Sequence, residues 1–167
     1  MTKNLDIKGL RSVLINYDLF FIDLWGVIHN GIELYKDAVD VLEKLSEAKK
    51  DYVLLTNAPR PKKNVENFLE KMGLDKNKRE KVFTSGEAAL NFLKNKCLNQ
   101  NFYHIGPPRD FNLFNDFKKN KTEKISESDY FLCTGLYDDH DQDLNYYNDL
   151  LLNYVSKKMI CTNPDLI

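Results

Sequence analysis

The sequence predicts an α/β fold built on a parallel sheet, because short apolar runs alternate with segments of helical periodicity. The run 19–23 is apolar up to its last residue, Asp23, and a similar run covers residues 52–57. Between these runs, apolar residues recur at helical spacing over residues 36–50. A strand, a helix and a second strand in this order form a unit whose two strands are parallel.

The alternation continues after the second run. Pro61 suits the first turn of a helix, and Gly73 stands where a C-terminal cap belongs. Residues 81–84 predict a short third strand, and Ser85 is the predicted N-cap of a helix over residues 86–95.

From about residue 85 the chain becomes more polar and richer in aromatic residues, which predicts a second lobe. We therefore expect one part over residues 1–84 and another over residues 85–167. The expected elements of the second part are strands at 102–105 and 130–134, a long helix at 141–157, and a last strand at 159–162.

Composition and charge narrow the functional classes. With 43% hydrophobic and 29% charged residues among 167, the chain has the composition of a folded globular protein. With a net charge of −1, the chain has no overall positive electrostatic field that would attract nucleic acid or an anionic membrane surface. The basic runs 76–79 and 118–121 are interpreted as solvated loops or helix ends.

Cysteine usage and hydropathy favour a cytoplasmic protein. The three cysteines are far apart and form no CxxC pair, which indicates free thiols in a reducing compartment and disfavours a zinc site. No segment approaches the roughly 18 uninterrupted apolar residues of a membrane span, and no secretory apolar core begins the chain.

The candidate site lies at the ends of the first two predicted strands. Asp23 is followed by residues 24–31, a turn-forming stretch with two glycines, so its carboxylate should be presented to solvent. Because open parallel sheets bind ligands at the carboxyl ends of their strands, Asp23 is a candidate nucleophile or metal ligand. Together with Thr56 and Asn57 it outlines a phosphate-handling site.

Four short motifs occur in an order that resembles a known family. They are Asp23-Leu24-Trp25-Gly26-Val27, Leu54-Leu55-Thr56-Asn57, Thr84-Ser85-Gly86 and Cys161-Thr162-Asn163-Pro164-Asp165. This order resembles class IIA of the haloacid dehalogenase superfamily, nearest to its nucleotide monophosphatase and 4-nitrophenylphosphatase-like branch. The resemblance implies a Rossmann-like parallel-sheet core with an inserted α/β cap. Residues 1–84 would be the N-terminal part of the core, and residues 85–167 an incomplete cap in which the chain ends.

The resemblance also implies a chemistry and the residues that perform it. It implies a magnesium-dependent hydrolase of small phosphate monoesters, in which Asp23 attacks phosphorus and becomes an aspartyl-phosphate. Thr56 and the Asn57 amide match the phosphate-binding positions, while the Asp23 carboxylate and the Trp25 carbonyl match Mg²⁺ ligands. Asn163 and Asp165 match a cap loop that faces the active site in relatives. The implied partner is a small phosphorylated metabolite. Association of two or more copies of the chain through the cap is a further possibility.

Two departures from the family pattern leave catalytic activity an open question. Trp25 stands where most phosphatases of the superfamily have a second aspartate as general acid–base, and an indole cannot do that work. His29 is the nearest titratable substitute, although a structural role fits it better. The family's later lysine and acidic metal-binding loop have no counterpart in the chain, so we expect it to be the N-terminal part of a longer protein.

Other interpretations remain beside this one. The chain could be a non-catalytic relative that binds a phosphorylated ligand or a protein partner. Asp23 and Thr56 could serve only as turn and capping residues, and the Asn163-Pro164-Asp165 turn needs no function to exist. Arg60 suits phosphate binding and solvation equally. A receiver-type phosphoacceptor domain fits less well, because Asp23 lies on the first predicted strand.

Overall fold

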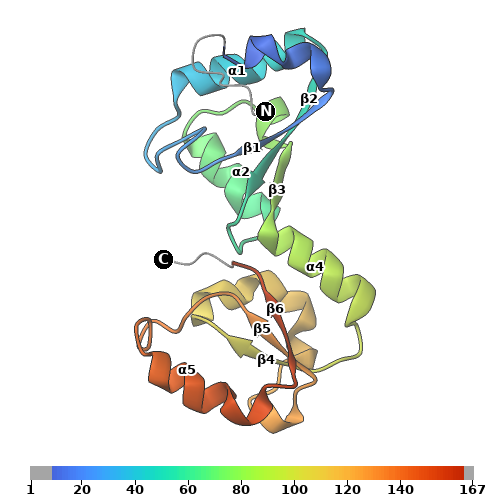
Figure 1. Cartoon of the computed structure of the whole chain (residues 1–167), viewed down its shortest axis with the longest axis vertical. Helices are drawn as coiled ribbons and strands as arrows, with labels where there is room; N and C mark the ends of the chain where they lie inside the picture. The colour runs from blue at the N-terminus through green and yellow to red at the C-terminus, as the bar shows by residue number, and fades with distance from the viewer. Residues whose placement is uncertain (1–8, 164–167) are drawn as a thin grey trace. The chain divides into compact units, whose positions relative to one another are not determined.

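A computed structural model describes residues 9–163. It contains two three-stranded sheets, β1-β2-β3 and β4-β5-β6, each with neighbours in chain order. Contacts divide the chain into a first unit, Met1–Thr56 with Glu66–Phe83, and a second unit, Asn57–Val65 with Thr84–Ile167. Figure 1 shows the elements of both units.

The first sheet consists of β1 (Leu19–Asp23), β2 (Asp51–Thr56) and β3 (Val82–Thr84). β1 and β2 are parallel, with Phe20 opposite Tyr52 and Asp23 opposite Leu55. The α-helices of this part are α1 (Lys36–Glu47), the short α3 (Lys76–Arg79) and α2 (Lys62–Lys71) from Glu66 onward, since its first residues belong to the second unit. Two 3₁₀ turns, η1 (Leu10–Ser12) and η2 (Leu14–Asn16), precede β1.

One face of the first sheet is buried and the other is largely exposed. Tyr52 and Leu54 on β2 are fully buried, as are Leu42 and Leu45 on α1. The alternate positions are open to solvent: Phe21 on β1 is 66% exposed. Because side chains alternate between the faces of a strand, this pattern marks one covered and one uncovered face.

The second sheet consists of β4 (Phe102–Ile105), β5 (Tyr130–Cys133) and β6 (Lys158–Cys161), all parallel. Its helices are α4 (Ser85–Lys96) and α5 (Leu144–Leu151), with 3₁₀ segments η3 (Pro108–Asn120), η4 (Ile125–Glu127) and η5 (Leu152–Tyr154). The core between α4, η3 and the sheet is aromatic and aliphatic: Leu93, Phe102, Phe114 and Leu132 have no exposed surface.

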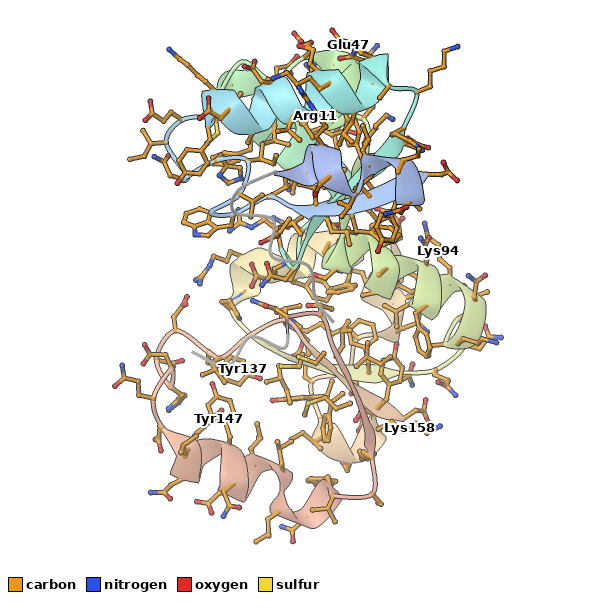
Figure 2. All side chains as sticks on the ribbon, turned by 45° about the horizontal axis from the view of Figure 1, so that its top comes forward. Arg11, Glu47, Lys94, Tyr137, Tyr147 and Lys158 are labelled. Carbon is orange, nitrogen blue, oxygen red and sulfur yellow. The ribbon has the colours of Figure 1, made fainter. Side chains whose placement is uncertain are left out.

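A tyrosine cluster packs beside this sheet. The Tyr137 and Tyr147 rings are parallel within 5° at 6.2 Å between centroids, and the Tyr137 amide donates to the Tyr147 hydroxyl. Figure 2 labels both side chains. The Tyr137 hydroxyl in turn donates to the His104 carbonyl over 3.0 Å, which connects α5 to β4.

The sequence predicted the α/β class and the parallel sheets correctly, and three local expectations were wrong. The long helix expected over residues 141–157 is α5 followed by η5, and its N-cap is Asp143, whose carboxylate accepts the Tyr146 amide. The N-cap of α4 is Thr84, not Ser85: its hydroxyl accepts the Glu87 amide over 2.9 Å.

The third correction concerns the basic run 76–79. Lys78 is only 3% exposed, not solvated, and its ammonium lies 2.8 Å from both Glu43 and Asp75. A buried lysine of this kind is tolerated because two carboxylates compensate its charge. Hydrogen bonds to Asp75 and Glu43 raise the pKa of Lys78, so the ion pairs persist at neutral pH.

Candidate active site

Asp23 occupies the last position of β1 and is exposed to solvent. Its Oδ1 accepts the amide of Leu24 over 2.8 Å, which fixes the orientation of the carboxylate. Because one oxygen is held by this bond, the other can face an incoming electrophile or a cation. The strand therefore positions a carboxylate with one constrained and one available oxygen.

The segment after Asp23 is an ordered turn. The Leu24 carbonyl accepts the amides of Ile28 (2.9 Å) and His29 (3.2 Å), and the Gly26 amide donates to the His29 carbonyl over 2.8 Å. Gly26 has φ +73°, a left-handed conformation that a residue with a side chain rarely adopts. The turn thus holds the backbone that follows Asp23 in a fixed arrangement.

Trp25 covers the second glycine of this turn. Its side chain is 64% exposed, and a Cβ placed on Gly31 would lie 2.6 Å from the indole ring. Gly31 also has φ +92°, a backbone conformation that favours glycine, whereas the exposed indole could move away from an added Cβ. Trp25 is therefore a surface ring resting on backbone, with no acid–base group to offer.

His29 is buried and its ring is fixed on three sides. It is 4% exposed, and its Nδ1 accepts the Gly31 amide over 3.0 Å. The ring contacts Trp25 and Phe68 edge-on, each at 5.5 Å between centroids. Burial lowers the pKa of His29, with Asp23 opposing the shift, so the imidazole is neutral at pH 7. These contacts favour a structural role, since Nδ1 already accepts a backbone hydrogen bond.

Thr56 is the last residue of β2 and lies one position beyond Leu55, the register partner of Asp23. The carboxyl ends of two adjacent strands thus bring a carboxylate and a hydroxyl residue to the same sheet edge. Asn57, the next residue in the chain, is exposed.

The loop 57–60 is held by the residues that begin α4. The Ser85 hydroxyl donates to the carbonyls of Asn57 (2.7 Å) and Ala58 (3.0 Å), and the Thr84 hydroxyl donates to the Arg60 carbonyl (2.8 Å). A Cβ on Gly86 would lie 2.6 Å from the Arg60 carbonyl oxygen, so glycine permits the close approach of the two backbones. Sequence reasoning placed Thr84-Ser85-Gly86 in a motif but missed this supporting role. The signal for this role in the sequence was that three small residues, Thr84, Ser85 and Gly86, stand at the start of the helix.

Arg60 is exposed and lines a hollow of about 200 Å³ in the second unit, with Asn64, Arg109 and Asp110 among the other lining residues. Burial raises the pKa of Asp110, and the cations Arg109 and Arg60 oppose the shift. Arg109 is also paired with Asp138. The hollow has mixed charge, so it leaves both sequence interpretations of Arg60 open.

Asn163 lies at the end of the described chain, two residues after β6. Its carbonyl accepts the Cys161 thiol over 3.3 Å. Its Oδ1 is buried and has no hydrogen-bond partner within residues 9–163. Asp165, the other predicted cap-loop residue, lies outside the described residues.

Across the described part of the chain, no three His, Cys, Asp or Glu side chains converge as a metal site. The oxygens of Asp23 and of the Trp25 carbonyl are of the kind that Mg²⁺ prefers, so the donors fit the metal in type. Residues 9–163 also contain no helix long and apolar enough to cross a membrane.

Comparison with known proteins identifies relatives by sequence and by structure. Residues 20–118 match the sequence model of a family described as haloacid dehalogenase-like hydrolase. A hydrolase of the haloacid dehalogenase-like family from Brucella suis 1330 is 30% identical, with a TM-score of 0.76 over 93% of this chain and 59% of its own. No curated protein sequence matches significantly.

Two further structures share the fold at lower identity. A 4-nitrophenylphosphatase from Thermotoga maritima is 24% identical, with a TM-score of 0.68 over 92% of this chain and 57% of its own. A glycerol phosphate phosphatase from Mycobacterium tuberculosis, in complex with calcium, is 20% identical, with a TM-score of 0.62 over 92% of this chain and 45% of its own. The chain therefore spans less than two thirds of the length of these structures.

Proposed function

The chain belongs to the haloacid dehalogenase-like hydrolases, and on this premise we propose that it is a magnesium-dependent phosphatase of small phosphate monoesters with Asp23 as its nucleophile. The observation that carries the proposal is the exposed Asp23 carboxylate at the end of β1, with Thr56 at the end of the adjacent strand. A carboxylate nucleophile and hydroxyl or amide donors at one sheet edge are what phosphoryl transfer through an acyl-phosphate needs.

In the proposed reaction, the Asp23 oxygen that does not accept the Leu24 amide attacks phosphorus. The new bond joins this oxygen to phosphorus while the bond to the ester oxygen breaks, and water later hydrolyses the aspartyl-phosphate. The Thr56 hydroxyl and the Asn57 amide would donate to the phosphate oxygens. The Asp23 carboxylate and the Trp25 carbonyl would hold Mg²⁺, which offsets the negative charge shared by carboxylate and phosphate when bound.

Trp25 shapes the proposed reactivity. The departing oxygen receives no proton from the indole, and the buried His29 is neutral with its Nδ1 engaged. General acid catalysis contributes typically 10²–10⁴-fold, so esters with acidic leaving groups should be much better substrates than alkyl esters.

We extend the proposal to the organisation of the whole protein. Residues 1–84 would form the N-terminal part of the catalytic core and residues 85–167 part of a cap. Asn163 and Asp165 would belong to a loop that selects the substrate. The three free cysteines support a reducing compartment, the cytoplasm.

The test replaces Asp23 by Asn in the product of the complete reading frame, because the chain spans less than two thirds of its structural relatives. An amide does not attack phosphorus, so magnesium-dependent release of 4-nitrophenol from 4-nitrophenyl phosphate should be abolished. Asp40→Asn, an exposed carboxylate on α1, is the matched control and should retain activity. More than a tenth of the parent rate in Asp23→Asn would refute Asp23 as nucleophile.

A second candidate function is a non-catalytic relative that binds a phosphorylated ligand, which the replacement of the acid–base residue by Trp25 favours. The same assay separates the two. Phosphate-ester binding by the parent without turnover of either aryl or alkyl esters would establish the binding protein, whereas turnover that depends on Asp23 would establish the phosphatase.

A further inference from the structure

Cys133 and Cys161 end neighbouring strands of the second sheet and lie on the same face of it. Cys133 is the last residue of β5 and Cys161 the last residue of β6, and the two are register partners in the parallel ladder. Register partners in a parallel pair project their side chains to the same face. The two thiols interact, because Cys161 adds to the effect of burial that raises the pKa of Cys133.

The two thiols also share one local geometry. Cys133 Sγ donates to the Gly135 carbonyl over 3.6 Å, and Cys161 Sγ donates to the Asn163 carbonyl over 3.3 Å. Each side chain thus bonds to the carbonyl two residues ahead. Neighbouring strands are about 4.7–4.9 Å apart, inside the range of about 4.4–6.8 Å between Cα atoms that disulfides span.

Solvent access distinguishes the three cysteines. Cys161 is exposed and Cys133 is half-buried, while Cys97 is buried in the core cluster of the second unit. Burial, with Cys161 next in importance, raises the pKa of the Cys133 thiol. Cys161 is therefore the thiol that a small oxidant in solution meets first.

We propose that Cys133 and Cys161 form a redox-sensitive dithiol, which hydrogen peroxide converts into an intrachain disulfide. The Cys161 thiolate attacks one peroxide oxygen, the O–O bond breaks, and the products are a sulfenic acid at Cys161 and water. The Cys133 sulfur then attacks the Cys161 sulfur, the S–S bond forms and a second water leaves. In sum, two thiols and one peroxide give one disulfide and two waters.

The disulfide would fix the strand ends that lead to Asn163. The amide and the hydroxyl of Thr162, the buried residue between Cys161 and Asn163, both donate to the Cys133 carbonyl, over 2.9 and 3.3 Å. A covalent link at this point would hold β6 to β5 immediately before Asn163. The inference does not depend on the proposed phosphatase activity.

The experiment treats the native protein with hydrogen peroxide, blocks the remaining thiols and digests it with trypsin without reduction. Cys133 lies in the tryptic peptide 125–157 and Cys161 in the segment that follows Lys158, so the disulfide joins two separate peptides. Of the cysteines in residues 1–167, Cys97 should remain a free thiol while Cys133 and Cys161 do not.

Variants identify the partners. Cys97→Ser, the matched control, should still form the link, whereas Cys133→Ser and Cys161→Ser should not. Three intact thiols in the peroxide-treated parent, a sulfinic acid at Cys161 beside a free Cys133, or a link between two chains would each overturn the proposal. The peptide map of the parent decides the question even if a variant does not fold.

Discussion

The two sheets have the same topology, but their central strands are covered to different degrees. Both consist of three strands in chain order. On the central strand β5 the neighbouring residues Phe131 and Leu132 are 2% and 0% exposed, whereas on β2 only alternate residues are fully buried. Of the edge strands, β1 exposes Phe21 to 66% and β6 exposes Met159 to 46%. The second sheet has helical segments and an aromatic cluster around it. The first sheet has one covered face and one apolar face in contact with solvent.

This difference shows which of the two units covers its own apolar surface. The second unit completes a hydrophobic core of its own, centred on Phe102 and Phe114. An apolar sheet face open to water is costly, and such faces are ordinarily covered by further protein. The proposed nucleophile belongs to the less covered sheet, so its surroundings depend more on what contacts that face.

The largest expected effect tests this contrast directly. Phe114→Ala removes a fully buried ring in contact with the rings of Phe102 and Phe111, and should cost about 3–5 kcal/mol of unfolding free energy. Phe21→Ala removes an exposed ring and should cost less than about 0.5 kcal/mol. Urea unfolding followed by far-UV circular dichroism measures both. Equal costs would mean that Phe21 is covered in solution and that the contrast between the sheets is false.

A second test compares the glycines that follow β3 and β5. A Cβ on Gly86 would meet the Arg60 backbone at 2.6 Å, whereas the nearest atom to a Cβ on Gly135 is 3.8 Å away. Gly86→Ala should therefore cost about 1–3 kcal/mol by forcing the loop 57–60 aside. Gly135→Ala is the matched control and should be close to neutral. Thermal unfolding of both variants distinguishes them. Similar unfolding temperatures would show that the loop 57–60 moves aside at little cost.

The smallest effect is a pH dependence in the second sheet. Burial, with Lys121 adding to it and Glu123 opposing, lowers the pKa of His104 to about 4. Above pH 6.5 the residue is neutral in both folded and unfolded chains and contributes nothing. As the pH falls toward 4 only the unfolded chain takes up the proton, so stability is lost, by at most about 2 kcal/mol at pH 5.

His104→Gln is the variant that checks this dependence. Urea midpoints at pH 7.5 and pH 5 should differ less in the variant than in the parent, because the group that takes up the proton is gone. An unchanged difference would assign the acid sensitivity to other groups, of which the buried His29 is the first to test.

The sequence was most informative where the periodicity was regular. The runs that became β1 and β2 and the helix between them were predicted within a few residues, and with them the strand-end position of Asp23. The segment η3 was missed, because its 3₁₀ geometry and the non-helical dihedral angles at Phe114 break the 3.6-residue pattern. The helix expected over residues 141–157 was too long, and the exposed Leu144 and Val155 show that its apolar stripe was only partly a packing surface.

Long-range contacts were beyond the sequence. The burial of Lys78 depends on Glu43, which is 35 residues away in the chain. The support of the loop 57–60 by Ser85 spans a similar separation. In the candidate site, residue types and their strand ends were predictable, whereas the contact of the Trp25 ring with Gly31 required coordinates.

Trp25 is the sole tryptophan of the chain, and this gives the first unit an intrinsic fluorophore. The indole is open to water on one side and rests against Gly31 and His29 on the other, two residues from Asp23. Excitation of tryptophan therefore selects the turn beside the proposed nucleophile and nothing in the second unit. Emission intensity and wavelength can follow ligand or metal binding at this turn in real time, without a label and without catalytic turnover.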